Sequence, residues 1–270
     1  MLVNPKELLK KAQRKKRAIG AFNAYNLETA KAIIQTAEAL KAPVIVETTP
    51  RAIEYAGLRY LARLIQEMAE SVSVPVALHL DHGLSIEMVE KCLEAGYTSV
   101  MIDGSHLPFM ENVALTRKVV EIASRKKVPV EGELGTLTEH LRFTNPEEVG
   151  EFVKRTQVDS LAVSIGSSHG HAPREKLNLE LLEKIRKKTD IPLVLHGASG
   201  VSDEDLKGAI ERGIVKINVD TQLREAFTDA LVEAFKYPQT KDPRDYLQKA
   251  EEAVAEVVEE KILLFGSMDV

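Results

Sequence analysis

Ionisable side chains cluster where one apolar segment of the chain ends. Residues 74–83 read Val-Pro-Val-Ala-Leu-His-Leu-Asp-His-Gly, and such a nearly unbroken apolar run is typical of a strand buried on both faces of a parallel sheet. Asp81 and His82 stand at its end. Buried groups of this kind must be hydrogen-bonded, bind a metal or take part in catalysis, because burying them without partners is costly. The motif alone fits metal chemistry and a hydrogen-bonded core cluster equally well.

Four of the seven histidines lie at or just beyond the ends of three such segments. These are His82, His169, His171 and His196. Three imidazoles from three strands, with carboxylates nearby, are typical of a catalytic zinc site that keeps one position open for substrate. We predict His82, His169 and His196 as the ligands, with His171 as the competitor of His169. We favour His169 because Gly170 follows it and lets the backbone approach a ligand closely.

The remaining three histidines have other predicted places. His79 shares strand parity with Asp81, so we expect it to point into the same interior, where it supports a ligand or packs in the core. We expect His106 and His140 in loops or on the surface.

Short apolar runs alternate with helical stretches along the whole chain. We predict strands at residues 18–23, 43–47, 75–80, 98–102, 128–134, 160–165, 192–196 and 214–219. Helices are predicted at 27–40, 58–70, 86–95, 110–127, from 146, at 179–188, from 202, at 221–235 and at 245–264. Eight βα units without a linker predict one α/β domain over residues 1–270, a single (β/α)₈ TIM barrel with an additional C-terminal helix. A doubly wound sheet is the alternative, but it usually has a glycine-rich fingerprint after its first strand.

Polar residues follow each predicted strand, as a barrel with its chemistry at the carboxyl ends of the strands requires. The last three strand ends are rich in glycine and hydroxyl side chains, around residues 166–170, 197–200 and 218–221. Exposed backbone N–H groups at helix N-termini, together with hydroxyl groups, form a phosphate site that needs no lysine. We therefore expect a phosphorylated ligand beside the metal.

Composition narrows the function classes. The net charge is −5 and no basic block is present, which argues against nucleic acid or an anionic membrane as the partner. The single cysteine, Cys92, excludes an intramolecular disulfide and a thiolate zinc cluster. With no signal peptide and no long apolar span in the sequence, we expect a cytoplasmic protein.

Six motifs, in this order, resemble those of the class II, metal-dependent ketose-bisphosphate aldolases. They are His-Leu-Asp-His-Gly (79–83), Met-Ile-Asp-Gly-Ser-His (101–106), Val-Glu-Gly-Glu-Leu-Gly (130–135), Gly-Ser-Ser-His-Gly (166–170), Leu-His-Gly-Ala-Ser-Gly (195–200) and Lys-Ile-Asn-Val-Asp-Thr (216–221). The family includes fructose-1,6-bisphosphate and tagatose-1,6-bisphosphate aldolases, and the resemblance runs essentially from end to end. It implies reversible cleavage of fructose 1,6-bisphosphate to dihydroxyacetone phosphate and glyceraldehyde 3-phosphate. Tagatose 1,6-bisphosphate, the C4 epimer, or another ketose phosphate is the alternative substrate.

The resemblance also implies roles for individual residues. Asp81 would be the catalytic proton donor, and His82, His169 and His196 would bind the catalytic Zn²⁺. Asp103 and Glu133 would match a second divalent metal position, and a monovalent cation is a further expected ligand. Substrate and phosphate contacts would come from Asn23, Thr49, Gly170, Gly197, Ala198, Ser199, Asn218, Val219, Asp220, Thr221 and Arg244. The partners would be phosphorylated ketoses and triose phosphates, and we expect a homodimer or homotetramer.

One segment departs from the family pattern. Aldol chemistry needs a second acid or base that exchanges a proton at C3, and family members commonly carry it on an acidic loop with Gly-Gly after the fifth strand. Residues 135–144 lack Gly-Gly, so the nearest acid, Glu139, is the candidate. Two other readings stay open: a metal-free Schiff-base aldolase that uses Lys216, and a non-catalytic phosphosugar-binding barrel.

Overall fold

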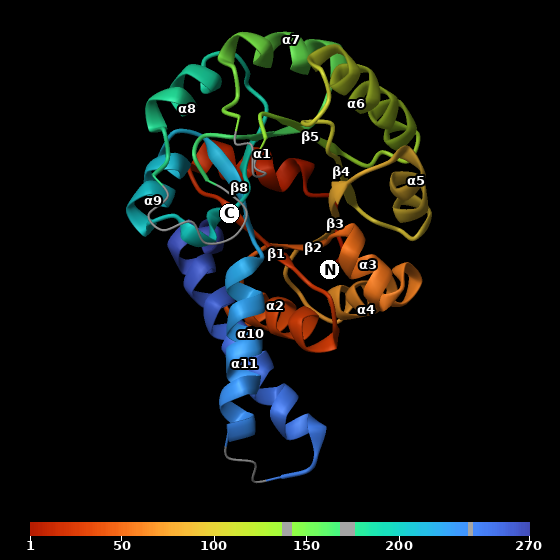
Figure 1. Ribbon diagram of the computed structural model, residues 1–270, viewed down its shortest axis with the longest axis vertical. Helices are drawn as coiled ribbons and strands as arrows, with labels where there is room; N and C mark the ends of the chain where they lie inside the picture. Colours follow the sequence, from red (N-terminus) through yellow and green to blue (C-terminus); the bar gives the residue numbers. More distant parts are fainter. Residues whose placement is uncertain (137–141, 168–175, 237–239) are drawn as a thin grey trace.

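Eight parallel strands close into a barrel in chain order, each pairing with the next and β8 with β1. The computed structural model describes residues 1–136, 142–167, 176–236 and 240–270. The strands are β1 (Ile19–Asn23), β2 (Val44–Thr48), β3 (Val76–Gly83), β4 (Ser99–Ile102), β5 (Val130–Leu134), β6 (Ser160–Val163), β7 (Leu193–Leu195) and β8 (Ile214–Val219). The predicted TIM barrel is confirmed, and the eight strands lie where the apolar runs placed them (Figure 1).

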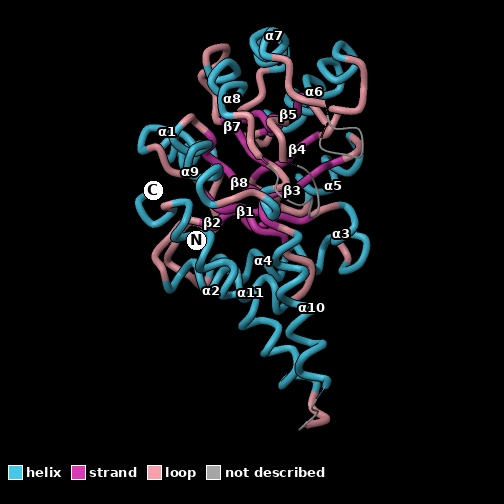
Figure 2. Tube along the Cα trace, turned by 60° about the vertical axis from the view of Figure 1, so that its left-hand side comes forward, coloured by secondary structure: helices cyan, strands magenta, loops and turns pink. Residues whose placement is uncertain are grey.

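Helices surround the barrel and link its strands. They are α1 (Lys6–Lys15), α2 (Leu27–Ala39), α3 (Pro50–Ala56), α4 (Leu58–Glu70), α5 (Ile86–Glu94), α6 (Phe109–Ser124), α7 (Pro146–Thr156), α8 (Leu179–Arg186), α9 (Asp203–Glu211), α10 (Thr221–Lys236) and α11 (Pro243–Phe265). The sequence analysis did not assign α1 or α3. The additional C-terminal helix is α11, which packs along α10, and this hairpin extends well beyond the barrel (Figures 1 and 2).

Side-chain caps fix where several helices begin. Ser85 accepts a hydrogen bond from the Met88 backbone N–H at the start of α5, and Ser202 accepts one from Asp205 at the start of α9. Pro146 occupies the first turn of α7, where its missing N–H leaves no helical bond unmade. These helix starts agree with the predicted ones.

The interior of the barrel is layered. Where the strands begin, the interior is filled by apolar strand side chains, which are Ile19, Ala21, Ile45, Ala77 and Val215. Helix α1 covers this end of the barrel with Leu9 and Ala12. Farther along the strands, Glu47, Glu131 and Lys216 meet inside the barrel, although they come from β2, β5 and β8. The barrel is therefore sealed at one end and charged toward the other, where the strands finish.

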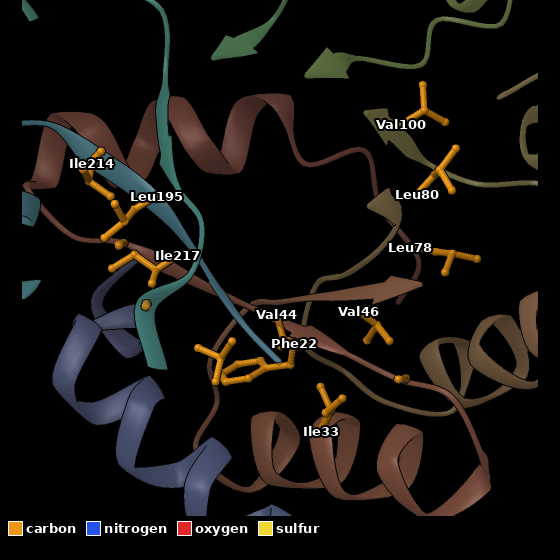
Figure 3. Packing of buried hydrophobic residues seen from close by; sticks show 14 of the residues in the cluster. Phe22, Ile33, Val44, Val46, Leu78, Leu80, Val100, Leu195, Ile214 and Ile217 are labelled. Atoms are coloured by element: carbon orange, nitrogen blue, oxygen red, sulfur yellow. The ribbon is translucent and has the colours of Figure 1, made fainter. Parts of the chain in front are cut away.

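Outward-facing strand residues pack under the helices in one continuous core. Figure 3 shows Leu78, Leu80 and Val46 on the outer side of their strands, and Ile33 of α2 pointing toward the strand that carries Phe22. Burial on both faces explains why the strands read as apolar runs rather than as alternating patterns. Cys92 is a buried free thiol of α5, and among the described helices none combines the length and apolarity needed to cross a membrane.

Candidate metal and substrate site

The end of β3 carries a local irregularity that brings two neighbouring side chains to one point. Successive residues of a regular strand point to opposite faces. His82, however, has a left-handed φ of 48°, and the register between β3 and β4 shifts between Leu80 and Gly83. Gly83 fits here because a Cβ atom at this position would lie 2.5 Å from the Met101 carbonyl oxygen. As a result, His82 Nε2 lies 3.7 Å from Asp81 Oδ1.

Two imidazoles face each other at the centre of the site. His82 Nε2 and His196 Nδ1 are 3.0 Å apart, with the two rings nearly perpendicular at 87°. The other nitrogen of each ring contacts a carboxylate: His82 Nδ1 lies 3.0 Å from Asp103 Oδ2, and His196 Nε2 lies 2.8 Å from Glu131 Oε1. Imidazoles that bind metals are usually oriented in this way, by a carboxylate on the opposite nitrogen.

The residues present fit a bound cation. Asp81, His82 and His196 each place one ligand atom within 4.8 Å of the others, as metal ligands do. Burial alone would lower the pKa of His82, but the negative charges of Asp81, Asp103 and Glu133 raise it to about 10. Burial lowers the pKa of His196, which favours the neutral form that binds metals. The site therefore attracts positive charge, and it offers imidazole and carboxylate donors to hold it.

A second potential metal group shares one of these ligands. His82, Asp103 and Glu133 also bring their donor atoms within 4.8 Å of one another. Glu133 is buried, and its Oε2 atom has no hydrogen-bond partner among the described residues. Burial raises the pKa of Glu133 well above its usual range, and the nearby Asp103 carboxylate adds to this effect. A cation bound between the Asp103 and Glu133 carboxylates would stabilise the ionised form of both.

Two amides hold the Asp81 carboxylate in place. Asn23 Nδ2 donates to Asp81 Oδ2 at 3.0 Å, and Asn218 Nδ2 donates to Asp81 Oδ1 at 3.2 Å. Burial alone would raise the pKa of Asp81, but the positive charges of His82 and Lys216, with the Asn23 hydrogen bond, lower it to about 2. The amide oxygens of Asn23 and Asn218 are buried and lack partners among the described residues, so each can accept one more hydrogen bond.

A buried ion network lies directly beneath this site. Lys216 Nζ is 2.7 Å from Glu47 Oε1 and 2.9 Å from Glu131 Oε2, and all three side chains are at most 1% exposed. Burial would lower the pKa of Lys216, but the charges of Glu131 and Glu47 raise it above its usual value. The Lys216 amine is therefore a protonated ion-pair partner, which makes it a poor nucleophile and disfavours the Schiff-base reading. His79 is buried beside it and bonds Ser99, as expected for a supporting core histidine.

Comparison with known proteins identifies the family. A family model described as fructose-bisphosphate aldolase class-II matches residues 3–270. The chain belongs to this family. It is 42% identical over 277 residues to the D-tagatose-1,6-bisphosphate aldolase subunit GatY of Klebsiella oxytoca, covering 98% of both proteins.

Solved structures agree with this assignment. The YdjI aldolase from Escherichia coli K12 is 37% identical, with a TM-score of 0.92 over 99% of this chain and 98% of the other. A putative fructose-1,6-bisphosphate aldolase from Coccidioides immitis is 30% identical, with a TM-score of 0.89 over 98% and 96%. The chain is thus a class II aldolase by sequence and by fold.

Most of the residues expected to contact substrate lie around the mouth of the aldolase barrel. Asn23, Thr49 and Asp220 line one cavity beside Asp81. Gly197 has a left-handed φ of 67° and opens a short 3-10 turn, Ala198–Gly200, after β7. Ser199 in this turn accepts a hydrogen bond from the Gln222 backbone N–H at 3.4 Å, which joins the turn to the start of α10. Val219 is buried at the end of β8, and Thr221 begins α10.

Other predicted residues fall elsewhere. Arg244 lies in the first turn of α11, at the far end of the hairpin that leaves the barrel, and its side chain is 87% exposed and paired with Asp242 (Figure 2). Within this chain the structure does not bring Arg244 to the site. His169, Gly170, His171, Glu139 and His140 lie outside the described residues. His106 is exposed, as predicted.

Glu131 and Glu47 lie next to the site, and the sequence analysis did not select them. Glu47 ends one predicted strand and Glu131 lies within another, but nothing in the sequence marked their partners on distant strands. A usable signal was parity: Glu131 and Glu133 are two residues apart on one strand and therefore face the same interior. One carboxylate oxygen of Glu131 contacts the His196 ring, and the other accepts a hydrogen bond from the Lys216 amine. Because Lys216 holds the carboxylate in place, we infer that Glu131 orients His196.

We expect Glu131→Gln to weaken zinc binding by about 10- to 100-fold, the usual effect of losing a carboxylate behind a ligating imidazole. An amide cannot accept hydrogen bonds from both His196 and Lys216, because one of its two ends is a donor. Zinc affinity is measured by competition with a chelating dye, with the exposed Glu121→Gln as the control. Equal affinities in the two variants would contradict the orienting role.

Proposed function

We propose that this class II aldolase cleaves a ketose 1,6-bisphosphate reversibly to dihydroxyacetone phosphate and glyceraldehyde 3-phosphate, with Zn²⁺ as its metal. The observation that carries the proposal is that His82, His196 and Asp81 bring their potential ligand atoms within 4.8 Å of one another at the barrel mouth. A metal group and an ionised carboxylate at one point are what carbon–carbon cleavage next to a carbonyl requires. Bound zinc would supply the Lewis acid that stabilises negative charge on the carbonyl and hydroxyl oxygens of the dihydroxyacetone phosphate half.

Asp81 is the proposed proton-transfer group at the C4 hydroxyl. In the cleavage direction its carboxylate accepts the hydroxyl proton, and in the condensation direction the carboxyl returns that proton to the aldehyde oxygen. Its low pKa keeps it ionised at neutral pH, ready to accept. Asn23 and Asn218 keep the carboxylate in position, and their free amide oxygens are available to substrate hydroxyl groups.

Further roles complete the proposal. His169 is the proposed third zinc ligand, and Glu139 the proposed group that exchanges the proton at C3. Asp103 and Glu133 are proposed to hold a second divalent ion, and a monovalent cation is proposed near the phosphate. Gly170 and the turns at residues 197–199 and 218–221 are the proposed phosphate contacts. We also propose that residues 1–270 act as one domain in a cytoplasmic homodimer or homotetramer, without a nucleic acid or membrane partner.

The substrate is proposed to be tagatose 1,6-bisphosphate, with fructose 1,6-bisphosphate as the second candidate. The sequence analysis favoured fructose, but the 42% identity with a tagatose-1,6-bisphosphate aldolase subunit supports the C4 epimer at least as well. The epimers differ only in the orientation of the hydroxyl group that meets Asp81, so small changes around that carboxylate decide between them.

Side-by-side kinetics on the two sugars tests the assignment. We expect cleavage of tagatose 1,6-bisphosphate with a kcat/KM at least tenfold higher, about 1.4 kcal/mol of discrimination. Activity should disappear in excess chelator and return with added zinc. A tenfold preference for fructose would reverse the substrate assignment, and tight binding of both sugars without cleavage by the zinc-loaded protein would favour a phosphosugar-binding barrel instead.

A further inference from the structure

A cavity of about 450 Å³ opens beside Asp81, between the ends of β1, β2 and β8. Asn23 and Thr49 form part of its wall, and Asn23 donates to the Asp81 carboxylate. The volume lies in the range of small-molecule sites, about 300–1,000 Å³. Because Asp81 is the proposed group at the C4 hydroxyl, the cavity adjoins the place where the aldehyde half of the ketose would lie.

The walls of this cavity combine aromatic surface with two guanidinium groups. Tyr25 and Phe227 pack edge to face, with ring centroids 6.2 Å apart. Arg224 is neutralised locally, since its Nε lies 3.0 Å from Asp220 Oδ2. Arg51, in the first turn of α3, also lines the cavity and is exposed.

Among the described residues, Arg51 is a cation of this cavity that has no partner. Across residues 1–136, 142–167, 176–236 and 240–270 it has neither an ion pair nor a hydrogen bond. A guanidinium carries five N–H donors and binds a phosphate or carboxylate through two of them at once. An unpaired arginine on the wall of a cavity that also contains a substrate-side asparagine is suited to an anionic group on the ligand.

We propose that Arg51 binds the terminal anionic group of the aldehyde half, and that it thereby makes the enzyme select phosphorylated over unphosphorylated aldehydes. This inference rests on the proposed aldolase function and adds a specificity-determining residue to it. The sequence analysis placed Arg244 among the substrate and phosphate contacts, but Arg244 lies at the far end of the α10–α11 hairpin. Arg51, in contrast, lines the same cavity as Asn23, where the distal end of the substrate would lie.

The condensation reaction tests Arg51 without depending on which epimer is formed. Dihydroxyacetone phosphate is offered with either glyceraldehyde 3-phosphate or glyceraldehyde, and kcat/KM for each aldehyde is measured. We expect the wild-type protein to prefer glyceraldehyde 3-phosphate. In Arg51→Gln, kcat/KM for glyceraldehyde 3-phosphate should fall about tenfold or more, the usual loss of a charge-assisted hydrogen bond. The value for glyceraldehyde should stay within about twofold, which also shows that the variant is folded.

Two further variants sharpen the result. Arg51→Lys keeps the charge but not the paired donors, so it should recover part of the preference. Arg59→Gln removes an exposed arginine of α4 outside this cavity and should leave both values unchanged. Equal losses on both aldehydes in Arg51→Gln, or no loss on either, would overturn the inference while leaving the aldolase intact. A wild-type protein that condenses neither aldehyde would instead overturn the proposed function itself.

Discussion

Replacing Asp81 by asparagine should lower kcat about 100- to 10,000-fold, the usual contribution of a general acid–base group, and change substrate binding much less. The amide keeps the shape of the carboxylate but cannot carry a proton. We expect zinc content and stability to stay close to those of the wild-type protein. Single-turnover cleavage of the better bisphosphate, together with zinc analysis of the same samples, measures both effects.

The surroundings of Asp81 explain why this variant should fold. In the wild-type protein, Asn23 and Asn218 both donate to Asp81, and the amide oxygen of each has no partner among the described residues. Rotating one of these amides by half a turn lets its oxygen accept from the amide N–H that the substitution introduces at position 81, so the hydrogen bonds are remade. Asp159→Asn, the same exchange at a partly buried carboxylate that accepts a hydrogen bond from the Val130 backbone N–H, serves as a control for general damage. A kcat within tenfold of the wild-type value would remove Asp81 from the proton-transfer step.

The barrel and most of its site followed from local sequence patterns. Each buried strand had to read as an apolar run, and each polar residue after it had to lie at the same end of the barrel. That logic placed His82 and His196 together although 114 residues separate them, and the structure brings their ring nitrogens to 3.0 Å. A position at the end of a parallel barrel strand is sufficient to predict this proximity, since the carboxyl ends of all the strands lie around one mouth.

The missed features depend on geometry that a one-dimensional pattern does not contain. The left-handed backbone of His82 coincides with the register shift between β3 and β4, and such a shift depends on how two strands pair and not on the local sequence alone. Helix α3 has only seven residues, too few for helical periodicity, although Thr49 and Pro50 form a recognisable start. The partners of Glu131 are His196, which follows β7, and Lys216 of β8, and their distances depend on the stagger of the closed sheet.

Replacing Lys216 by methionine should destabilise the protein by about 3–5 kcal/mol, the usual cost of removing one partner from a buried ion pair. The ammonium lies between Glu47 and Glu131 in the barrel interior, and a methionine fills a similar volume without the charge. Burial already raises the pKa of Glu47 to about 8 in the presence of Lys216. Without that charge, the pKa of Glu47 would rise further, and the interior would hold a protonated Glu47 and a Glu131 carboxylate that has lost its ammonium partner. Urea denaturation of the wild-type protein and the variant measures the loss.

Two comparisons separate lost charge pairing from lost packing. Lys261→Met removes another largely buried lysine, but its partner Glu260 is 61% exposed, so we expect a cost of about 1 kcal/mol or less. Adding Glu47→Gln to Lys216→Met should recover part of the stability, because it removes one of the unpaired carboxyl groups. A Lys216→Met variant as stable as Lys261→Met would mean that the network contributes little to the fold. If borohydride trapped substrate on the wild-type protein but not on Lys216→Met, the lysine would be a nucleophile, contrary to the protonated ion pair described above.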